Sequence, residues 1–509
     1  MSKFTILGGL STALWLASLP ALASEPALAE LTISNAQQQM QQGLLTSEQL
    51  THYYLQQIQQ KNHQGPALHA FNDVNRDALK LAKRLDAERK AGKIRGPLHG
   101  IPVALKANIA TSDGLPTTAG ALALKGFLTK SDAQLVQQLR AAGAIVIGKT
   151  NLSEWANFRG NGSASGWSAL GGQTKNPYVL DRTPCGSSSG SAVAVAADLT
   201  LVAVGTETDG SITCPAAINN IVGIKPTANA VSGAGIIPIA HSQDIAGPMA
   251  RSVADAEILL DALTTPEAKQ QMERKETAQR TIQSVVLVRQ YDLQYPAVRQ
   301  MMDGVEAKLT AMGIKVHNIK QFDLDEQAGK DEFTVLIYEF KRDLNQWLAE
   351  NKVPSAVSDI AKIREFNLTK GKTALAFYGQ EYFDQASHLD LAAQQADYTQ
   401  ARARNLAAAK ALLDKELARA ELIIAPAYGP AWPIDHVKGD SFNFGTSSPA
   451  AISGYPSLTM PAGFDGELPL GISLIGDPWS EPMLIQVAKQ LEQPRVLPKY
   501  LPTLTVKTQ

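Results

Sequence analysis

The chain has 509 residues, of which 44% are hydrophobic and 19% charged, and its formal net charge at pH 7 is −1. This composition is typical of a globular protein with enough apolar residues for a large core. A charge near zero provides no basic field for nucleic acid or anionic lipid, so we expect neither partner. The sequence also lacks HExxH, paired-cysteine and clustered-carboxylate patterns, so we expect no metal and no cofactor.

The first residues are typical of an export signal. Lys3 is the only charge before Ser24, residues 4–19 are mostly apolar, and Pro20 precedes Ala-Leu-Ala, a small-x-small cleavage pattern. The apolar run is short for a membrane span. We therefore expect a signal peptide at residues 1–23, export to the periplasm or the medium, and a mature chain without membrane attachment.

Helix and strand patterns alternate along the rest of the chain. Thr46, with Gln49 three residues later, predicts a capping box at a helix start. Further helices are expected at residues 132–142, 252–263, 298–312 and 331–351, and strands at 101–105, 144–148, 199–204, 285–288, 422–425 and 469–475. This alternation predicts one large α/β domain, residues 24–509, in which helices cover both faces of a mixed β-sheet. A mainly helical insertion is expected near 331–419.

Hydroxyl groups concentrate in CGSSSGSAVAVAADLTLVAVGTETDGSITC, residues 185–214. An apolar helix and strand separate two serine-bearing turns, around Ser187 and Ser211, so both turns must rest on buried supports. Ser211 follows the strand and is a candidate nucleophile. Successive backbone N–H groups beside it can converge on one point as an oxyanion hole: those of Thr208, Asp209, Gly210 and Ser211.

A serine nucleophile needs a base, and Lys106 is the leading candidate. In GIPVALK an apolar strand runs directly into this lysine, so burial is expected to lower the pKa of its amine. An unshifted pKa near 10.4 would cost a base about 4–5 kcal/mol at pH 7. A serine hydroxyl from residues 187–189 can pass the proton from Ser211 to a neutral Lys106.

A competing motif lies in the same segment. GSSSG fits the G-x-S-x-G elbow of α/β-hydrolases, with Ser188 as nucleophile and His241 or His99 as its base. That elbow requires a strand immediately before it, whereas residues 178–185 contain charges and a proline. An α/β-hydrolase-type esterase is therefore the alternative.

Cys185 and Cys214 are too few for a disulfide framework. Export would permit a bond between them. We expect two small buried thiols.

Four segments, in their order and spacing, closely resemble the amidase signature family: GIPVALKANI, CGSSSGSA, GTETDGSITCPAA and GIKPT. The resemblance extends to GKTNLSEWANFRG, SQDIAGPMARSVADA and GYPSLTMPAGFDGELPLGISLIG, and it weakens between about 264 and 421. It implies the amidase signature fold and a Ser–cis-Ser–Lys triad. By this resemblance Ser211 forms the acyl-enzyme, Ser187 relays the proton from a cis peptide bond, and Lys106 is the base.

Within the family, these segments and AWPI near Trp432 are most similar to bacterial peptide amidases, which implies ammonia release from C-terminal peptide carboxamides. The expected partner is thus a small amide or a peptide amide. The glutaminase-type subunit of tRNA-dependent amidotransferases shares the signature, but it works in the cytosol, which the export signal disfavours. The chain departs from the family at Ala107, where Asp is common, and at Asp209, where Gly is frequent. Candidate cleft residues are Trp155, Asn157, Phe158, Arg159, Trp167 and Trp432.

Overall fold

The computed structural model describes residues 28–278 and 282–504, and the expected signal peptide at 1–23 lies outside the described residues. The strands are β1 (Phe71–Val74), β2 (Pro102–Lys106), β3 (Ile145–Thr150), β4 (Trp167–Ser168), β5 (Gly172–Gln173), β6 (Val202–Glu207), β7 (Val222–Lys225), β8 (Ile245–Ala250), β9 (Ser284–Val288), β10 (Lys315–Ile319), β11 (Leu422–Pro426), β12 (Ser457–Asp465) and β13 (Leu468–Ile475). β4 pairs with β5, and the other strands of the described ranges form one sheet in the order β1-β3-β2-β6-β8-β7-β12-β13-β11-β9-β10.

The sheet is mixed, as expected. β2 lies parallel to β3 and β6, and β9 lies parallel to β10 and β11, whereas the other neighbours pair antiparallel. The carboxyl ends of the parallel strands β2 and β6 reach the same edge of the sheet. Ligand sites of open α/β sheets lie beyond such ends. Lys106 ends β2 and Glu207 ends β6, so both side chains arrive at that edge.

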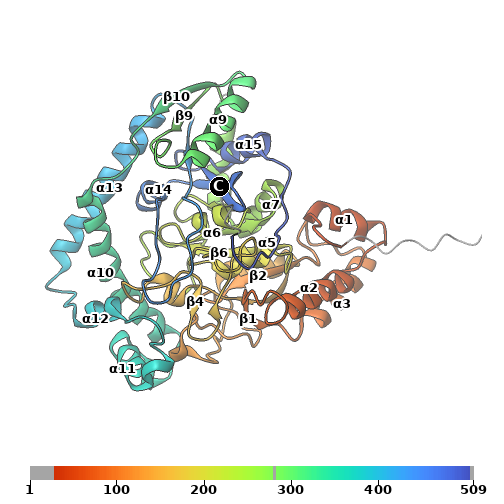
Figure 1. The fold of residues 1–509 in the computed structure, drawn as a ribbon. Helices are drawn as coiled ribbons and strands as arrows, with labels where there is room; N and C mark the ends of the chain where they lie inside the picture. Colours follow the sequence, from red (N-terminus) through yellow and green to blue (C-terminus); the bar gives the residue numbers. More distant parts are fainter. Residues whose placement is uncertain (1–27, 279–281, 505–509) are drawn as a thin grey trace, which may run out of the picture.

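The helices are α1 (Ile33–Gln41), α2 (Ser47–Lys61), α3 (Ala78–Lys90), α4 (Gln134–Ala141), α5 (Ser189–Ala196), α6 (Thr213–Ile218), α7 (Val253–Leu263), α8 (Pro266–Ala278), α9 (Pro296–Ala311), α10 (Glu326–Glu350), α11 (Ile360–Lys370), α12 (Glu381–His388), α13 (Gln395–Leu417), α14 (Ser448–Ser453) and α15 (Glu481–Leu491). They cover both faces of the sheet, as expected (Figure 1). α2 begins with the expected capping box between Thr46 and Gln49. No helix within the described ranges is both long and apolar enough to cross a bilayer.

All six expected strands are present within a few residues of their expected bounds, but β1, β4, β5, β7, β8, β10 and β12 were not expected. The central strand β8 reads IAGPMA, and a proline normally argues against such a position. Pro248 nonetheless lies opposite Val204 of β6. A Cβ on Gly247 would lie 2.0 Å from the carbonyl oxygen of Ile224, so glycine permits the close approach of β7. These strands are defined by their neighbours more than by local pattern.

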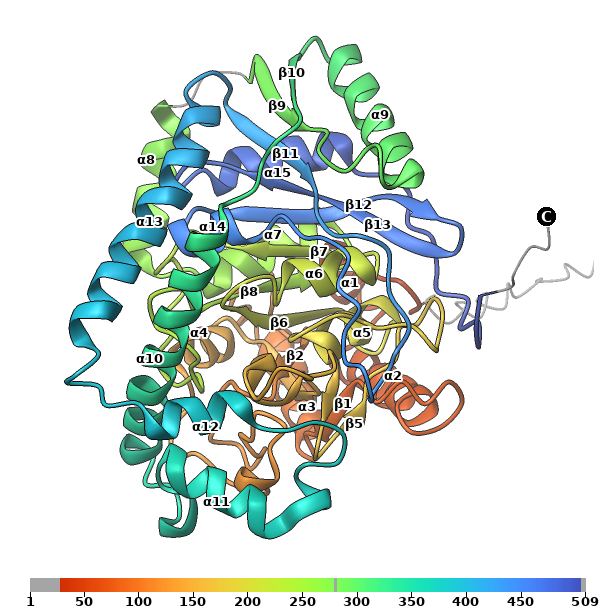
Figure 2. The same cartoon turned by 60° about the vertical axis from the view of Figure 1, so that its left-hand side comes forward.

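Helices α10 to α13 run along one side of the molecule, from the β9–β10 end towards β4 and β5 (Figure 2). α10 packs lengthwise against α13. Apolar residues of α10, including Phe340 and Leu344, form a buried cluster with Trp155, Phe158 and Ile239. These helices are therefore packed onto the loops that surround the carboxyl ends of β2 and β6.

Candidate active site

Lys106 ends β2 with its side chain fully buried. Its Nζ lies 2.7 Å from Ser187 Oγ, 2.8 Å from Thr206 Oγ1 and 3.0 Å from the carbonyl oxygen of Thr206. Thr206 belongs to β6, so the pairing of β2 with β6 brings these groups together. Burial lowers the pKa of Lys106 to about 7, against the opposing effect of the negative charges of Asp244 and Glu207. Near pH 7 a substantial fraction of this amine is therefore neutral.

Ser187 lies in a tight turn before α5. The Gly186–Ser187 peptide bond is cis, as the family resemblance implies. The carbonyl of Ser187 accepts the amide of Ser153 at 3.1 Å, and Ser187 is fully buried. A Cβ on Gly186 would lie 2.1 Å from Ser153 Oγ, so a glycine is needed there. The turn thus directs the Ser187 hydroxyl to Lys106 inside the protein.

Ser211 lies between β6 and α6, on the wall of a cavity. The carboxylate of Glu207 accepts the amides of Ile212 at 2.7 Å and Thr213 at 2.9 Å. Burial raises the pKa of Glu207, and these amide donors oppose that rise. A carboxylate at the end of β6 therefore orients the first turn of α6 and, with it, the preceding serine.

The two serine turns meet through the backbone. The amide of Ser188 donates to the carbonyl oxygen of Ser211 at 3.0 Å. In the part of the chain that the structure describes, the hydroxyls of Ser187 and Ser211 make no direct hydrogen bond to each other. The structure therefore joins Lys106 to Ser187 by their side chains and joins Ser211 to that turn by the main chain.

The predicted oxyanion loop borders the same cavity, from Thr208 to Ser211. Among the described groups, none accepts the amide protons of Asp209, Gly210 or Ser211. Gly210 has φ +79°, and a Cβ there would lie 2.3 Å from the hydroxyl oxygen of Tyr428. The loop therefore leaves backbone donors free beside Ser211, as stabilisation of an oxyanion requires.

Asp244 holds this loop, although it was not among the site residues expected from the sequence. Its carboxylate accepts the Thr208 hydroxyl at 2.5 Å and the amides of Ile239 and Ala240 at 2.8 and 3.0 Å. Burial raises the pKa of Asp244 to about 7. Asp244 lies in SQDIAGPMARSVADA, a segment that also resembles the family. This resemblance could have identified Asp244 as a candidate site residue.

The Asp209 side chain ties the loop to the C-terminal part of the chain. It accepts the hydroxyls of Ser447 at 2.5 Å and Ser448 at 2.6 Å. Tyr428 in turn donates to Ser447 Oγ at 2.7 Å. Burial raises the pKa of Asp209, while the two serine hydroxyls oppose the rise. No local sequence pattern indicated these contacts, because they join residues more than two hundred positions apart.

The cavity has a volume of about 530 Å³. Its aromatic lining comes from Phe158, Phe333, Tyr382, Tyr428, Trp432 and Phe442. Of the expected cleft residues, Asn157, Phe158 and Trp432 line it. Trp155, Arg159 and Trp167 are instead buried outside the lining, where Arg159 pairs with Glu154 at 2.9 Å.

Cys185 and Cys214 form a disulfide, with their Cα atoms 6.0 Å apart. The expectation of two buried thiols is therefore wrong. Sequence spacing could not reveal the bond because it joins the residue before the Gly186–Ser187 turn to the first turn of α6. Both cysteines line the cavity. The disulfide thus connects the two serine turns covalently, beside their backbone hydrogen bond.

The alternative nucleophile, Ser188, is poorly placed. It is fully buried, and its hydroxyl donates to the carbonyl of Thr206 at 3.0 Å and accepts the Thr206 amide at 3.2 Å. The His99 ring instead contacts the carbonyl of Leu85 at 2.9 Å. In the described part of the chain, the last strand before this turn is β5, which ends at Gln173, so no strand leads directly into it. The geometry therefore does not support the elbow arrangement.

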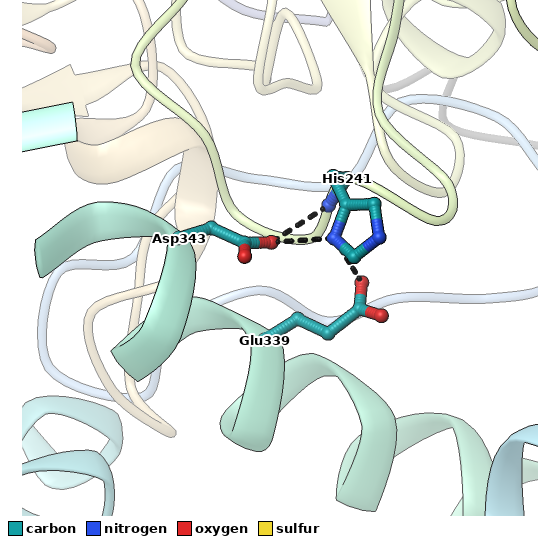
Figure 3. A group of neighbouring side chains, drawn as sticks. All are labelled: His241, Glu339 and Asp343. Carbon is teal, nitrogen blue, oxygen red and sulfur yellow. Dashed lines mark hydrogen bonds and ion pairs between the residues drawn. The ribbon is translucent and has the colours of Figure 1, made fainter. Parts of the chain in front are cut away.

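His241, the other candidate base for Ser188, faces α10 (Figure 3). Its Nδ1 lies 2.9 Å from Asp343 Oδ2 and 3.6 Å from Glu339 Oε2. Their ligand-type atoms lie within 4.8 Å of one another, but Arg342 Nε also donates to Asp343 at 2.7 Å. The Arg342 guanidinium supplies the positive charge of this group, so the residues form an ion-pair cluster between α10 and the loop before β8.

The fold is that of an amide hydrolase of the amidase signature class. The Amidase family model matches residues 49–485, and the chain belongs to that family. A probable amidase of Arabidopsis thaliana is 37% identical over 502 residues, covering 94% of this chain and 92% of the relative. A glutamyl-tRNA(Gln) amidotransferase component of Symbiobacterium thermophilum is 32% identical over 450 residues, covering 83% of this chain and 89% of that relative.

Solved structures extend the similarity. The peptide amidase of Stenotrophomonas maltophilia is 43% identical, with a TM-score of 0.86 over 93% of this chain and 99% of that one. A peptide amidase in complex with the competitive inhibitor chymostatin is 44% identical, with a TM-score of 0.86. The match covers 92% of this chain and 99% of that one. These matches confirm the expected amidase signature fold.

Loss of the Cys185–Cys214 bond should lower stability. The bond closes a loop with a sequence separation of 29. Chain entropy for such a loop corresponds to about 3–4 kcal/mol. Replacing both cysteines by serine should therefore lower the denaturant midpoint. A dithiol reductant should lower the denaturant midpoint of the native chain and leave the midpoint of the double variant unchanged. A native midpoint that does not move after complete reduction would contradict this prediction.

Proposed function

We propose that this amidase is an exported enzyme that hydrolyses C-terminal carboxamides of peptides to the acid and ammonia, through an acyl-enzyme on Ser211. The observation that carries the proposal is the buried 2.7 Å contact between Lys106 Nζ and Ser187 Oγ, next to a cavity bordered by Ser211 and unpaired backbone amides. A base, a hydroxyl, a nucleophile and oxyanion donors are the parts that acyl transfer requires.

In the acylation step, neutral Lys106 accepts the Ser187 hydroxyl proton while Ser187 takes the proton of Ser211. Ser211 Oγ then bonds to the amide carbon. The carbonyl oxygen becomes an oxyanion and receives hydrogen bonds from the amides of the loop at 208–211. The proton returns from Lys106 through Ser187 to the amide nitrogen as the C–N bond breaks and ammonia leaves. A pKa near 7 allows Lys106 both to accept and to return this proton.

Water completes the reaction. It loses a proton through the same relay, attacks the acyl carbon and displaces Ser211 Oγ, which regains its proton. The sum is one amide and one water consumed, and one carboxylic acid and one ammonia produced. Ala107 does not leave Lys106 without carboxylates, because the charges of Asp244 and Glu207 act on it.

Ser211→Ala should reduce kcat at least about 10³-fold, because no other hydroxyl replaces the nucleophile. Ammonia release from a peptide amide measures the loss. Ser188→Ala is the matched control, and we expect it to lose less than about tenfold, since the Ser188 hydroxyl hydrogen bonds to backbone groups of Thr206 and the substitution leaves the Ser188 backbone in place. The reverse ranking would replace this mechanism with the elbow alternative.

The substrate class is inferred from the cavity and from its relatives. Six aromatic side chains line about 530 Å³, which is ample for side chains of a peptide and excessive for a short aliphatic amide. Two of the similar enzymes with solved structures are peptide amidases, and one of these structures contains the competitive inhibitor chymostatin. Together these features favour a peptide amide.

A substrate panel tests this specificity. We expect kcat/KM for peptide amides to exceed that for propionamide by at least about 10²-fold, because apolar side chains fill the aromatic cavity. Phe442→Ala should lower kcat/KM for peptide amides and spare the small amide. Phe377→Ala, an exposed phenylalanine outside the cavity lining, should change neither. A preference for short aliphatic amides would contradict the peptide specificity and leave the amidase activity intact.

Export is proposed from the N-terminal pattern and supported by the disulfide. Disulfides persist in oxidising compartments such as the periplasm and the medium. Mass analysis of protein from those fractions should give a chain that begins at Ser24. A full-length chain that starts at Met1 and stays inside the cell would contradict the proposal.

A further inference from the structure

Glu332 of α10 is a partly buried acid that the mechanism above does not use. We propose that Glu332 is a positioning residue: in its protonated form it donates a hydrogen bond to Asp209 and holds the oxyanion loop, and its ionisation at alkaline pH releases the loop. This inference rests on the proposed role of residues 208–211 as oxyanion donors. By this inference α10, which lies beside the cavity, contributes to catalysis through Glu332.

Glu332 is linked to the oxyanion loop through Asp209 and Gln243. Its carboxyl group interacts with the carboxylate of Asp209, and this interaction raises the pKa of Glu332. Its Oε1 accepts Gln243 Nε2 at 2.8 Å, and the same Nε2 lies 3.4 Å from the carbonyl oxygen of Thr208. Phe333 and Leu336, also on α10, line the cavity next to this group. Glu332 is thus linked to two successive residues of the loop, to Asp209 by the electrostatic interaction and to Thr208 through Gln243.

Asp209 connects Glu332 to the free backbone amides of the oxyanion loop. Its carboxylate already accepts the hydroxyls of Ser447 and Ser448, so the acid of Glu332 completes a set of three donors around it. The backbone of Asp209 is part of the oxyanion loop itself. A displacement of its side chain therefore moves the N–H groups that receive the developing negative charge.

Two carboxyl groups in contact cannot both ionise without strong repulsion. Burial, followed by the charge of Asp209, raises the pKa of Glu332 to about 8. The other charge that faces it is Arg402 of α13, which opposes the rise. On α10 itself, the neighbouring Asp331 pairs with Arg404 instead. At neutral pH Glu332 is therefore the proton donor and Asp209 the anion.

The sign of the pH dependence follows from these two shifts. The Lys106 amine becomes neutral as pH rises through about 7, which activates the base. Glu332 has a raised pKa, so its hydrogen bond to Asp209 is present below about pH 8 and lost above it. kcat of the wild-type enzyme should therefore rise as pH passes about 7, where Lys106 becomes neutral. It should fall as pH passes about 8, where Glu332 ionises.

Glu332→Gln tests the alkaline side, because an amide keeps a donor for Asp209 and cannot ionise. With each profile normalised to its own maximum, we expect wild-type kcat to fall at least about tenfold between about pH 8 and pH 10, and kcat of E332Q to fall less than about twofold. Glu326→Gln is the matched control on the same helix. Glu326 is exposed and pairs with Lys330 at 2.7 Å, so this variant should keep the wild-type fall.

A fall in E332Q that matches wild type would overturn the inference, and so would inactivity at every pH in a folded E332Q enzyme. Asp209→Asn gives a second result that does not depend on the folding of E332Q. The asparagine amide can donate a hydrogen bond to Glu332 after Glu332 ionises, so the normalised profile should also lack the alkaline fall, and a retained fall would count against the inference. Failure of the proposed function is distinguishable, because it would show as turnover in Ser211→Ala or as a missing rise near pH 7.

Discussion

The site depends on the burial of one lysine amine between β2, β6 and the turn at Ser187. In water this amine would be charged at pH 7, and a buried charge without an acidic partner in contact is unfavourable. Lys106 instead contacts three oxygen atoms, of Ser187 and Thr206, and its pKa falls to about 7. The sheet supplies both the desolvation and the hydrogen-bond acceptors, because β2 and β6 are parallel neighbours that end at one edge.

Around that amine, separate restraints hold the two serine turns in register. The Cys185–Cys214 disulfide joins them covalently, the Ser188 amide binds the Ser211 carbonyl, and Glu207 holds the first turn of α6. Such redundancy has a physical reason. A proton relay and an oxyanion hole work only when donors and acceptors keep their positions within a fraction of an ångström.

The oxyanion loop is also held by hydrogen bonds from distant parts of the chain. Asp244 holds Thr208, whereas Ser447 and Ser448 hold Asp209 from the start of α14. α10 approaches the same loop through Glu332, whose Oε1 accepts a hydrogen bond from Gln243. Farther along α10, Glu339 and Asp343 contact His241 of the loop before β8 (Figure 3). The helices that cover the site are therefore coupled to its electrostatics as well as to its shape.

The sequence by itself determined the α/β class, the strand that delivers Lys106 and the family to which the chain belongs. Those features rest on local periodicity and on contiguous motifs, which a linear pattern records. It did not reveal β8, where Pro248 conflicts with local propensity, nor the disulfide, nor the carboxyl groups of Asp244 and Glu332 around the loop. Only the tertiary structure decided these, because pairing, burial and charge contacts between distant residues depend on which segments meet in space.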